Sequence, residues 1–249
     1  MTTLFISDLH LDDGRPESTA LFEQFVDEEA MRSDALYILG DLFEYWIGDD
    51  APTATSKRVT TALTALGNAG VPCFFMHGNR DFLLGEEFAR ESSLTLLPQE
   101  HVINLYGKQV LLLHGDTLCT DDVAYQKVRQ EVRSDKWQNW FLAQTVDQRI
   151  AFALEAREDS REHQSNLSME IMDVNPGAVC RIFEQYGVRE MIHGHTHRPA
   201  VHEHMISGGE ARRYVLGDWY EQGSVIRADA DGLRLDRYPF NGPAATLLT

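Results

Sequence analysis

Short apolar runs alternate with amphipathic segments through much of the chain. Five of these runs have the length and composition of buried strands, at residues 4–7, 35–39, 73–76, 110–113 and 190–192. Between them, apolar residues recur at helical spacing, as with Leu21, Phe22 and Phe25 on one face of residues 17–31. Further helices are expected at 56–69 and 81–90. Strands that alternate with helices predict an α/β layered fold.

The pattern changes after Cys119. Residues 121–168 contain neither glycine nor proline and are predicted to be helical throughout. A further helix is expected at 178–186, ended by Gly187. Strand-like composition returns at Glu190, and residues 212–238 are expected to form antiparallel strands with turns at Asp218 and at Asp231-Gly232. We therefore predict a single domain over residues 1–249, with a helical insertion at about 121–168 between two parts of one sheet core.

Polar residues follow each of the five predicted strands. The motifs are Asp8-Leu9-His10, Gly40-Asp41, Gly78-Asn79-Arg80-Asp81, His114-Gly115-Asp116 and Gly194-His195-Thr196-His197. Each lies at the carboxyl end of a strand, where open sheets build their sites. If the strands continue through the motifs, Asp8 and His10 face the same way, as do His195 and His197. The glycines before Asp41 and Asn79 allow the backbone to turn there.

These motifs supply seven candidate metal ligands. They are Asp8, His10, Asp41, Asn79, His114, His195 and His197. Carboxylate, amide and imidazole donors suit Mn²⁺, Fe²⁺ or Zn²⁺. Seven ligands exceed the four of a tetrahedral site, so two ions that share a carboxylate, about 3.5–4 Å apart, fit better. Each motif alone is typical of an ordinary strand end or turn, and only their joint occurrence predicts a dinuclear centre.

Composition narrows the possible partners. The formal net charge of −17 argues against nucleic acid as a partner, because phosphate backbones attract lysine and arginine. The cysteines Cys73, Cys119 and Cys180 show no pairing pattern, which favours reduced thiols in a cytosolic setting. We expect no signal peptide, and no apolar run reaches the roughly 18 residues of a membrane span.

Arg80 bears on the choice of reaction. A dinuclear centre polarises phosphoryl oxygens and activates water for in-line attack on phosphorus. The guanidinium of Arg80 is a poor proton donor but grips phosphate oxygens in pairs. A leaving phosphate is a stable anion that needs little acid assistance, so Arg80 favours diphosphate cleavage over monoester or alkyl diester cleavage. The alternative is that Arg80 simply pairs with a nearby aspartate.

The predicted helical insertion carries two further patterns. Residues 125–161 hold seven basic and six acidic side chains, so the net charge of this segment is near zero in an otherwise acidic chain. This local charge would allow the segment to lie beside anionic phosphates or an anionic lipid leaflet. Trp137, Trp140 and Phe141 form one apolar stripe at helical spacing. That stripe either packs a helix on the core or forms a wall for acyl chains or a membrane-facing lid.

The five motifs together resemble the calcineurin-like metallophosphoesterase superfamily, whose pattern is D-x-H, G-D, G-N-[HR]-[DE], a single His and G-H-x-H. The resemblance implies a four-layer αββα sandwich with the helical insertion as a lid. It also implies that Asp8, His10, Asp41 and His197 hold one ion. Asp41, Asn79, His114 and His195 would hold the other, with Asp41 bridging.

Longer runs resemble the UDP-2,3-diacylglucosamine diphosphatase family, among them residues 4–11, 40–50, 77–85, 114–122, 171–175 and 192–199. The resemblance implies Mn²⁺-dependent hydrolysis of UDP-2,3-diacylglucosamine by water attack on the α-phosphorus. The products would be UMP and 2,3-diacylglucosamine 1-phosphate, in lipid A biosynthesis. It implies two Mn²⁺ per chain, with Asp41, Asn79, Arg80 and His114 as catalytic residues. It also implies peripheral association with the cytoplasmic leaflet of the bacterial inner membrane, and no obligate protein partner is evident.

Substrate contacts carried over from this family are Asn79, Arg80, Asp122, Ser160, Gln164 and His195. The chain departs from the family pattern at Gln164 and Leu167, where asparagine and lysine are frequent. Leucine cannot bind phosphate, so Arg157 or Arg161 is the candidate replacement. Two rival functions stay open: a phosphoesterase for soluble nucleotides, which would not need the aromatic stripe, and a non-catalytic scaffold, which would typically have lost ligands.

Overall fold

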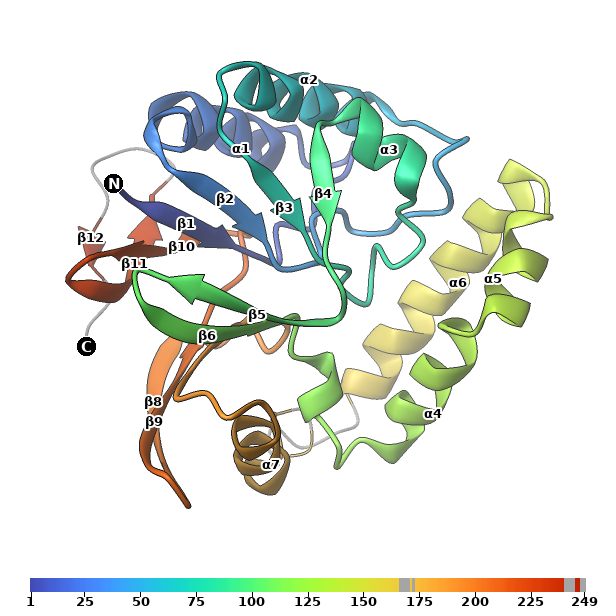
Figure 1. Ribbon diagram of the computed structural model, residues 1–249. Coiled ribbons are helices and arrows are strands. Elements are labelled where there is room, and N and C mark those ends of the chain that lie inside the picture. Colours follow the sequence, from blue (N-terminus) through green and yellow to red (C-terminus); the bar gives the residue numbers. More distant parts are fainter. Residues whose placement is uncertain (166–170, 172, 240–244, 247–249) are drawn as a thin grey trace.

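The computed structural model describes residues 1–165, 171, 173–239 and 245–246, with the side chains of residues 1–160, 171 and 173–239. Two β-sheets face each other, and helices cover their outer faces (Figure 1). This arrangement confirms the predicted α/β sandwich.

The first sheet has the strand order β12-β11-β10-β1-β2-β3-β4. Its parallel strands are β1 (Thr3–Ile6), β2 (Ala35–Ile38), β3 (Cys73–Phe75) and β4 (Leu94–Leu96). Its antiparallel part is β10 (Gly223–Asp229), β11 (Gly232–Tyr238) and β12 (Ala245–Thr246). In β1, Thr3 pairs with Ala35 on one side and with Ala228 on the other.

The second sheet has the order β5-β6-β7-β9-β8. Its strands are β5 (Glu100–Leu105), β6 (Lys108–Leu113), β7 (Glu190–His193), β8 (Ala200–Ile206) and β9 (Gly209–Val215). The antiparallel strands expected over residues 212–238 are confirmed for β10 and β11, which turn at Asp231-Gly232. However, β9 does not pair with β10: it lies antiparallel to β8 and parallel to β7, while β10 joins the first sheet. The chain crosses between the sheets after β9, where the Trp219 N–H donates to the Asp8 carbonyl.

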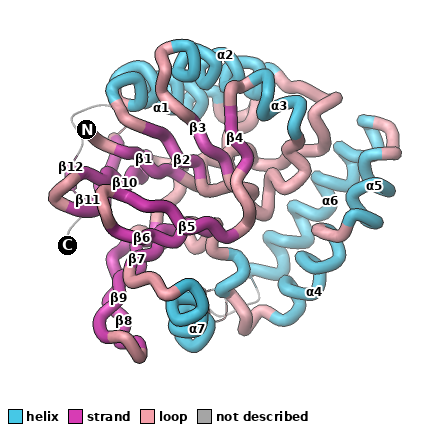
Figure 2. The backbone as a smooth tube through the Cα atoms, viewed as in Figure 1, coloured by secondary structure: helices cyan, strands magenta, loops and turns pink. Residues whose placement is uncertain are grey.

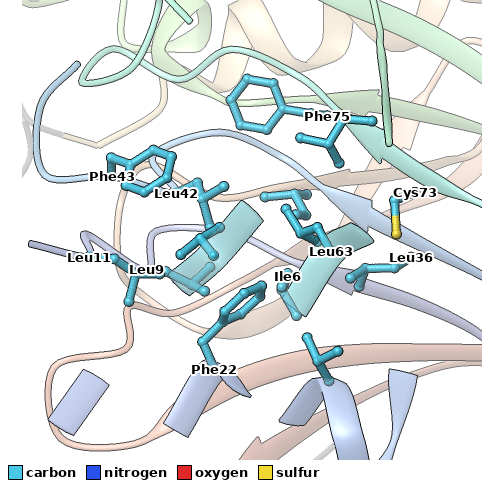
Figure 3. Packing of buried hydrophobic residues seen from close by; sticks show 14 of the residues in the cluster. Ile6, Leu9, Leu11, Phe22, Leu36, Leu42, Phe43, Leu63, Cys73 and Phe75 are labelled. Atoms are coloured by element: carbon cyan, nitrogen blue, oxygen red, sulfur yellow. The ribbon is translucent and has the colours of Figure 1, made fainter. Parts of the chain in front are cut away.

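Helices α1 (Pro16–Glu28), α2 (Ala54–Asn68) and α3 (Glu86–Glu91) cover the first sheet, and α7 (Pro176–Tyr186) lies against the second (Figure 2). Short 3₁₀ turns lie at Ala30–Arg32 and Asp116–Leu118. Ile6, Leu36 and Phe75 of the first sheet pack against Phe22 of α1 and Leu63 of α2 (Figure 3). Burial of these side chains fixes the strands whose ends carry the polar motifs.

The helix expected from residue 81 begins only at Glu86. The cause is Asp81, whose buried carboxylate accepts hydrogen bonds from the N–H groups of Gly78 (2.9 Å) and Leu42 (2.7 Å). A carboxylate that satisfies loop N–H groups in this way stabilises a turn in place of the first helical turn. By contrast, α7 ends where predicted, at Gly187 in the left-handed conformation (φ 64°).

Three helices fill the segment predicted as an insertion: α4 (Val123–Val132), α5 (Asp135–Leu142) and α6 (Val146–Ser165). They project beside the sandwich as a separate layer (Figure 1). The Arg149 guanidinium of α6 fixes them to the core by donating to the Ile47 carbonyl (2.5 Å) and to Asp50. The division into one domain with an inserted segment stays a prediction.

Candidate metal centre

The structure brings the seven predicted ligands to one place between the sheets. The first sheet supplies Asp8 and His10 after β1, Asp41 after β2 and Asn79 after β3. The second supplies His114 after β6 and His195 and His197 after β7. The centre therefore lies on the seam between the two sheets.

Strand alternation is the wrong explanation for how these side chains converge. Five of the seven residues have left-handed backbones: Asp8 (φ 57°), His10 (49°), Asp41 (52°), His195 (67°) and His197 (55°). This conformation costs a non-glycine residue about 1–2 kcal/mol and persists only where the surroundings enforce it. Here, Asp8 N–H donates to the Gly40 carbonyl (3.1 Å) and His10 N–H to the Asp41 carbonyl (3.0 Å).

The ligand atoms form two groups with Asp41 between them. In the first group, His197 Nε2 lies 3.4 Å from Asp8 Oδ1 and 3.1 Å from His10 Nε2. In the second, Asn79 Oδ1 lies 3.0 Å from His114 Nε2 and 2.9 Å from His195 Nδ1.

Asp41 Oδ2 lies 3.9 Å from His10 Nε2 and 3.7 Å from His114 Nε2, which is the place of a shared ligand. Asp8 also lies close to the second group, because its carboxylate clusters with Asp41 and His114. Imidazole nitrogens and carboxylate oxygens that face one another at these distances fit a pair of divalent cations.

Two glycines allow this close approach. A Cβ on Gly78 would lie 2.1 Å from Asp41 Oδ1 and 2.3 Å from Asp41 N. A Cβ on Gly194 would lie 2.1 Å from Asp8 Oδ2. The ligand carboxylates therefore occupy space that any other residue type at these two positions would fill.

Burial and mutual charge perturb the titration of the ligands. Burial alone raises the pKa of Asp8, but the hydrogen bond and charge of His197 lower it below its usual range. Burial opposes protonation of His197, yet its contacts with Asp8 and Asp218 raise its pKa to about 9. Burial and the charge of His114 lower the pKa of His195 to about 4. Burial and the charge of Asp41 raise the pKa of Asp81 to about 6. Such opposed shifts within one cluster are typical of functional sites.

In three of the histidines, the ring nitrogen that faces away from the ligand cluster contacts a further protein group. His114 Nδ1 lies 2.8 Å from the Leu39 carbonyl, His10 Nδ1 lies 3.2 Å from Glu44 Oε2, and His197 Nδ1 lies 3.5 Å from Asp218 Oδ2. A carbonyl or carboxylate on the outer ring nitrogen is the usual arrangement for metal-binding histidines, since it fixes the tautomer and the ring direction. The donor set thus fits metal binding beyond the ligand atoms themselves.

A cavity of about 210 Å³ extends from this centre beneath the helical insertion. Asn79, Arg80, Arg157 and Ser160 contribute polar groups to its lining. Its apolar lining includes Phe82, Trp137, Phe141, Phe152 and Ala153. The cavity therefore joins a polar region beside the ligands to an aromatic region under α5 and α6.

The three residues of the aromatic stripe differ in their surroundings: Trp137 and Phe141 line the cavity, whereas Trp140 does not. Trp137 and Phe141 stack on each other at 4.9 Å and contact Phe152 of α6 at 5.7 and 5.5 Å, so these two α5 residues join α5 to α6 and line the cavity. Trp140 is 51 % exposed and does not line the cavity, although its ring lies 6.0 Å from that of Trp137 and 6.4 Å from that of Phe152. The basic side chains of the insertion largely pair with the core: Arg129 with Asp116, Arg149 with Asp50 and Arg157 with Glu44.

The predicted substrate contacts lie in different surroundings. Arg80 and Ser160 line the cavity and His195 lies in the centre, whereas Asp122 caps α4 by accepting from Tyr125 N–H (2.9 Å). Among the described residues, no carboxylate lies within 4.0 Å of the Arg80 guanidinium, so the alternative of an Arg80–aspartate pair is not observed. Gln164 belongs to α6, but its side chain, that of Arg161 and the whole of Leu167 lie outside the described residues.

Sequence reasoning did not identify Tyr125 and Glu44. Tyr125 stacks on His195 with ring centroids 5.9 Å apart. Glu44 is 4 % exposed and contacts both His10 and Arg157. The position of Glu44, three residues after Asp41 at the end of a predicted strand, was the available signal.

Comparison with known proteins agrees with this geometry. The sequence model of the family described as calcineurin-like phosphoesterase matches residues 1–199. A UDP-2,3-diacylglucosamine hydrolase of Stenotrophomonas maltophilia is 54 % identical over 95 % of this chain and 98 % of its own length. Enzymes of the same name from Serratia proteamaculans and Escherichia coli O7:K1 are 52 % and 51 % identical, each over 96 % of this chain and all of their own length. Within the described residues, no helix is long and apolar enough to cross a bilayer.

Proposed function

This chain belongs to the calcineurin-like phosphoesterase family, and on that premise we propose that it hydrolyses the diphosphate bond of UDP-2,3-diacylglucosamine in lipid A biosynthesis. The products are UMP and 2,3-diacylglucosamine 1-phosphate. The observation that carries the proposal is the cavity that joins the ligand cluster and Arg80 to the aromatic region of the insertion. A substrate with a diphosphate and acyl chains needs both surroundings at once.

We further propose that the centre holds two Mn²⁺ ions. Asp8, His10, Asp41 and His197 would hold one, and Asp41, Asn79, His114 and His195 the other, in keeping with the central place of Asp41 Oδ2. When bound, such a pair polarises phosphoryl oxygens and lowers the pKa of water. The oxygen, amide and imidazole donors suit Mn²⁺ in type and number.

Arg80 would act on the diphosphate. Its guanidinium lines the cavity without an ion-pair partner among the described residues, while its backbone N–H donates to Asp41 Oδ1 (2.8 Å). Arg80 is therefore fixed beside the shared ligand, with its donors free to bind phosphoryl oxygens in pairs. Water forms the new bond to the α-phosphorus, and the bond from that phosphorus to the bridging oxygen breaks. The leaving phosphate departs as a stable anion, which agrees with an arginine at this position.

The aromatic region of the cavity supports a lipid substrate over a soluble nucleotide. Trp137, Phe141 and Phe152 present apolar surface that a free nucleotide would leave unused. The scaffold alternative is disfavoured because all seven ligand positions are kept and lie together. We also propose that the insertion rests on the cytoplasmic leaflet of the inner membrane through its exposed apolar side chains, such as Val128, Trp140 and Leu154.

The test is hydrolysis of UDP-2,3-diacylglucosamine by the Mn²⁺-loaded protein in H₂¹⁸O. We expect ¹⁸O in UMP, as attack on the α-phosphorus requires. Label in the lipid phosphate would place the attack on the other phosphorus. Equal turnover of a UDP-sugar without acyl chains would favour the soluble-nucleotide function instead.

A further inference from the structure

One buried carboxylate links the metal centre to the helical insertion. Glu44 lies in the loop after β2 and is 4 % exposed. Its Oε2 lies 3.2 Å from His10 Nδ1, and its Oε1 lies 2.8 Å from Arg157 Nε on α6. The Tyr220 hydroxyl lies 3.5 Å from Oε2, and its ring stacks on His10 with centroids 5.5 Å apart. His10 and Arg157 of α6 thus contact the two oxygens of one buried carboxylate.

The outer contacts of the other ligand histidines differ from this one. His114 is oriented by the backbone carbonyl of Leu39, which belongs to the sheet core, and His197 by Asp218, whose side chain is 28 % exposed. Neither contact involves the insertion, and the ring of His195 stacks on Tyr125, which belongs to α4 and not to α6. Of these contacts, the one through Glu44 and His10 is the one that reaches α6.

Arg157 helps to compensate the buried charge of Glu44, together with His10 and Arg80, whose charges also lower the pKa of this carboxyl. A buried carboxylate is costly unless cations or donors satisfy it, and removal of one partner leaves the other uncompensated. Without Arg157, the Glu44 carboxylate would be drawn toward other donors and would release or turn the imidazole of His10. Arg149 provides a comparison within the same helix, because it also reaches the core but pairs with Asp50, which contacts none of the seven proposed ligands within the described part of the chain.

We propose that Glu44 is a positioning residue that couples the docking of α6 through Arg157 to metal binding at His10. This inference rests on the metal centre proposed above. Its consequence is reciprocal, as any thermodynamic coupling must be: docked α6 strengthens metal binding, and bound metal strengthens the docking of α6. An insertion that closes on a substrate would thereby tighten the centre that acts on it.

The first test is a Mn²⁺ titration of the metal-free protein without substrate, followed by electron paramagnetic resonance. We expect Glu44→Gln to weaken one of the two Mn²⁺ sites by about 10- to 100-fold, as is usual when an outer partner of a metal ligand is lost. Arg157→Gln should weaken the same site by roughly two- to thirtyfold. Arg149→Gln should stay within about twofold of the unsubstituted protein. The double variant Glu44→Gln/Arg157→Gln should bind no more weakly than Glu44→Gln alone.

The second test is hydrogen exchange of the α6 amides. Mn²⁺ should slow this exchange in the unsubstituted protein and have little effect in Glu44→Gln. Unchanged Mn²⁺ affinity in Glu44→Gln, or equal losses in Arg157→Gln and Arg149→Gln, would overturn the coupling while leaving the proposed function intact. Failure of the unsubstituted protein to bind Mn²⁺ would instead refute the Mn²⁺ centre proposed above.

Discussion

Replacement of Gly78 by alanine should remove the metal centre while leaving the protein folded. The added Cβ would lie 2.3 Å from Asp41 N, whereas ordinary contacts begin at 3.4 Å, so the two loops must separate by about 1.1 Å. Metal–ligand distances tolerate only about 0.2 Å of deviation. Because Asp41 is placed between both groups of ligands, its displacement should abolish binding at both sites.

The cost to stability should be moderate. Overpacking of this kind costs about 1–3 kcal/mol, which corresponds to a fall of roughly 2–12 °C in Tm for a chain of this length. In the unsubstituted protein, Mn²⁺ at about 100 times its Kd should add about 2.7 kcal/mol, or roughly 5–11 °C. Thermal unfolding with and without Mn²⁺ therefore separates the two effects: Gly78→Ala should unfold somewhat earlier and gain nothing from the metal.

Gly67→Ala is the matched control. Its Cβ would lie 2.7 Å from Ser93 Cβ, which is a comparable clash placed between α2 and the residues after α3. This variant should lose stability but keep the full gain on Mn²⁺ addition. A Gly78→Ala protein that binds two Mn²⁺ ions with unchanged affinity would refute the argument that the close approach of the loops fixes Asp41.

Three further predictions follow from the site. Arg80→His should keep the metal content, because its guanidinium is not among the proposed ligands, yet lose most diphosphatase activity; unchanged turnover would contradict the role given to Arg80. Trp137→Ala should lower kcat/KM for substrates with long acyl chains by about 10- to 100-fold, whereas Trp140→Ala, at a 51 % exposed position outside the cavity, should change it little. Burial and then the charge of Arg213 lower the pKa of His193 from 6.5 to about 3, so between these two pH values the unfolded chain binds one more proton, and stability should fall as the pH is lowered through this window, by at most about 1.4 kcal/mol per pH unit. In metal-free protein, urea unfolding of His193→Asn should show a correspondingly flatter pH dependence; equal slopes would exclude His193 as the cause.

Much of the fold and the ligand set could be predicted because both depend on local pattern. Apolar runs bury themselves as strands, and the residues that follow them meet at one edge of a sheet. The same reasoning failed where tertiary contacts decide. Asp81 stabilises a turn by accepting loop N–H groups, so α3 starts late, and β9 pairs with β7 although it lies in sequence beside β10. The three-residue strand β4 is too short to show a period.

The details of the centre could not be predicted for a related reason. Left-handed backbones are uncommon outside glycine, even for Asp and His, which adopt them more often than most residue types. At Asp8 and His10 they are held by hydrogen bonds between neighbouring loops, which the sequence does not reveal. The contact of Glu44 with Arg157 joins segments far apart in the chain, and no periodic pattern in the sequence predicts such a contact.

The placement of the proposed ligands on the seam between the sheets would give a bound cation pair a role in how the molecule assembles. A nascent chain that has completed only β1 to β4 carries Asp8, His10, Asp41 and Asn79 but lacks His114, His195 and His197. Tight binding of two cations by all seven ligands would therefore require that both sheets have formed and packed together. Two bound cations would then link the two sheets, so that separating the sheets would require the release of both, and metal loss would lower the stability of the sandwich as well as its activity.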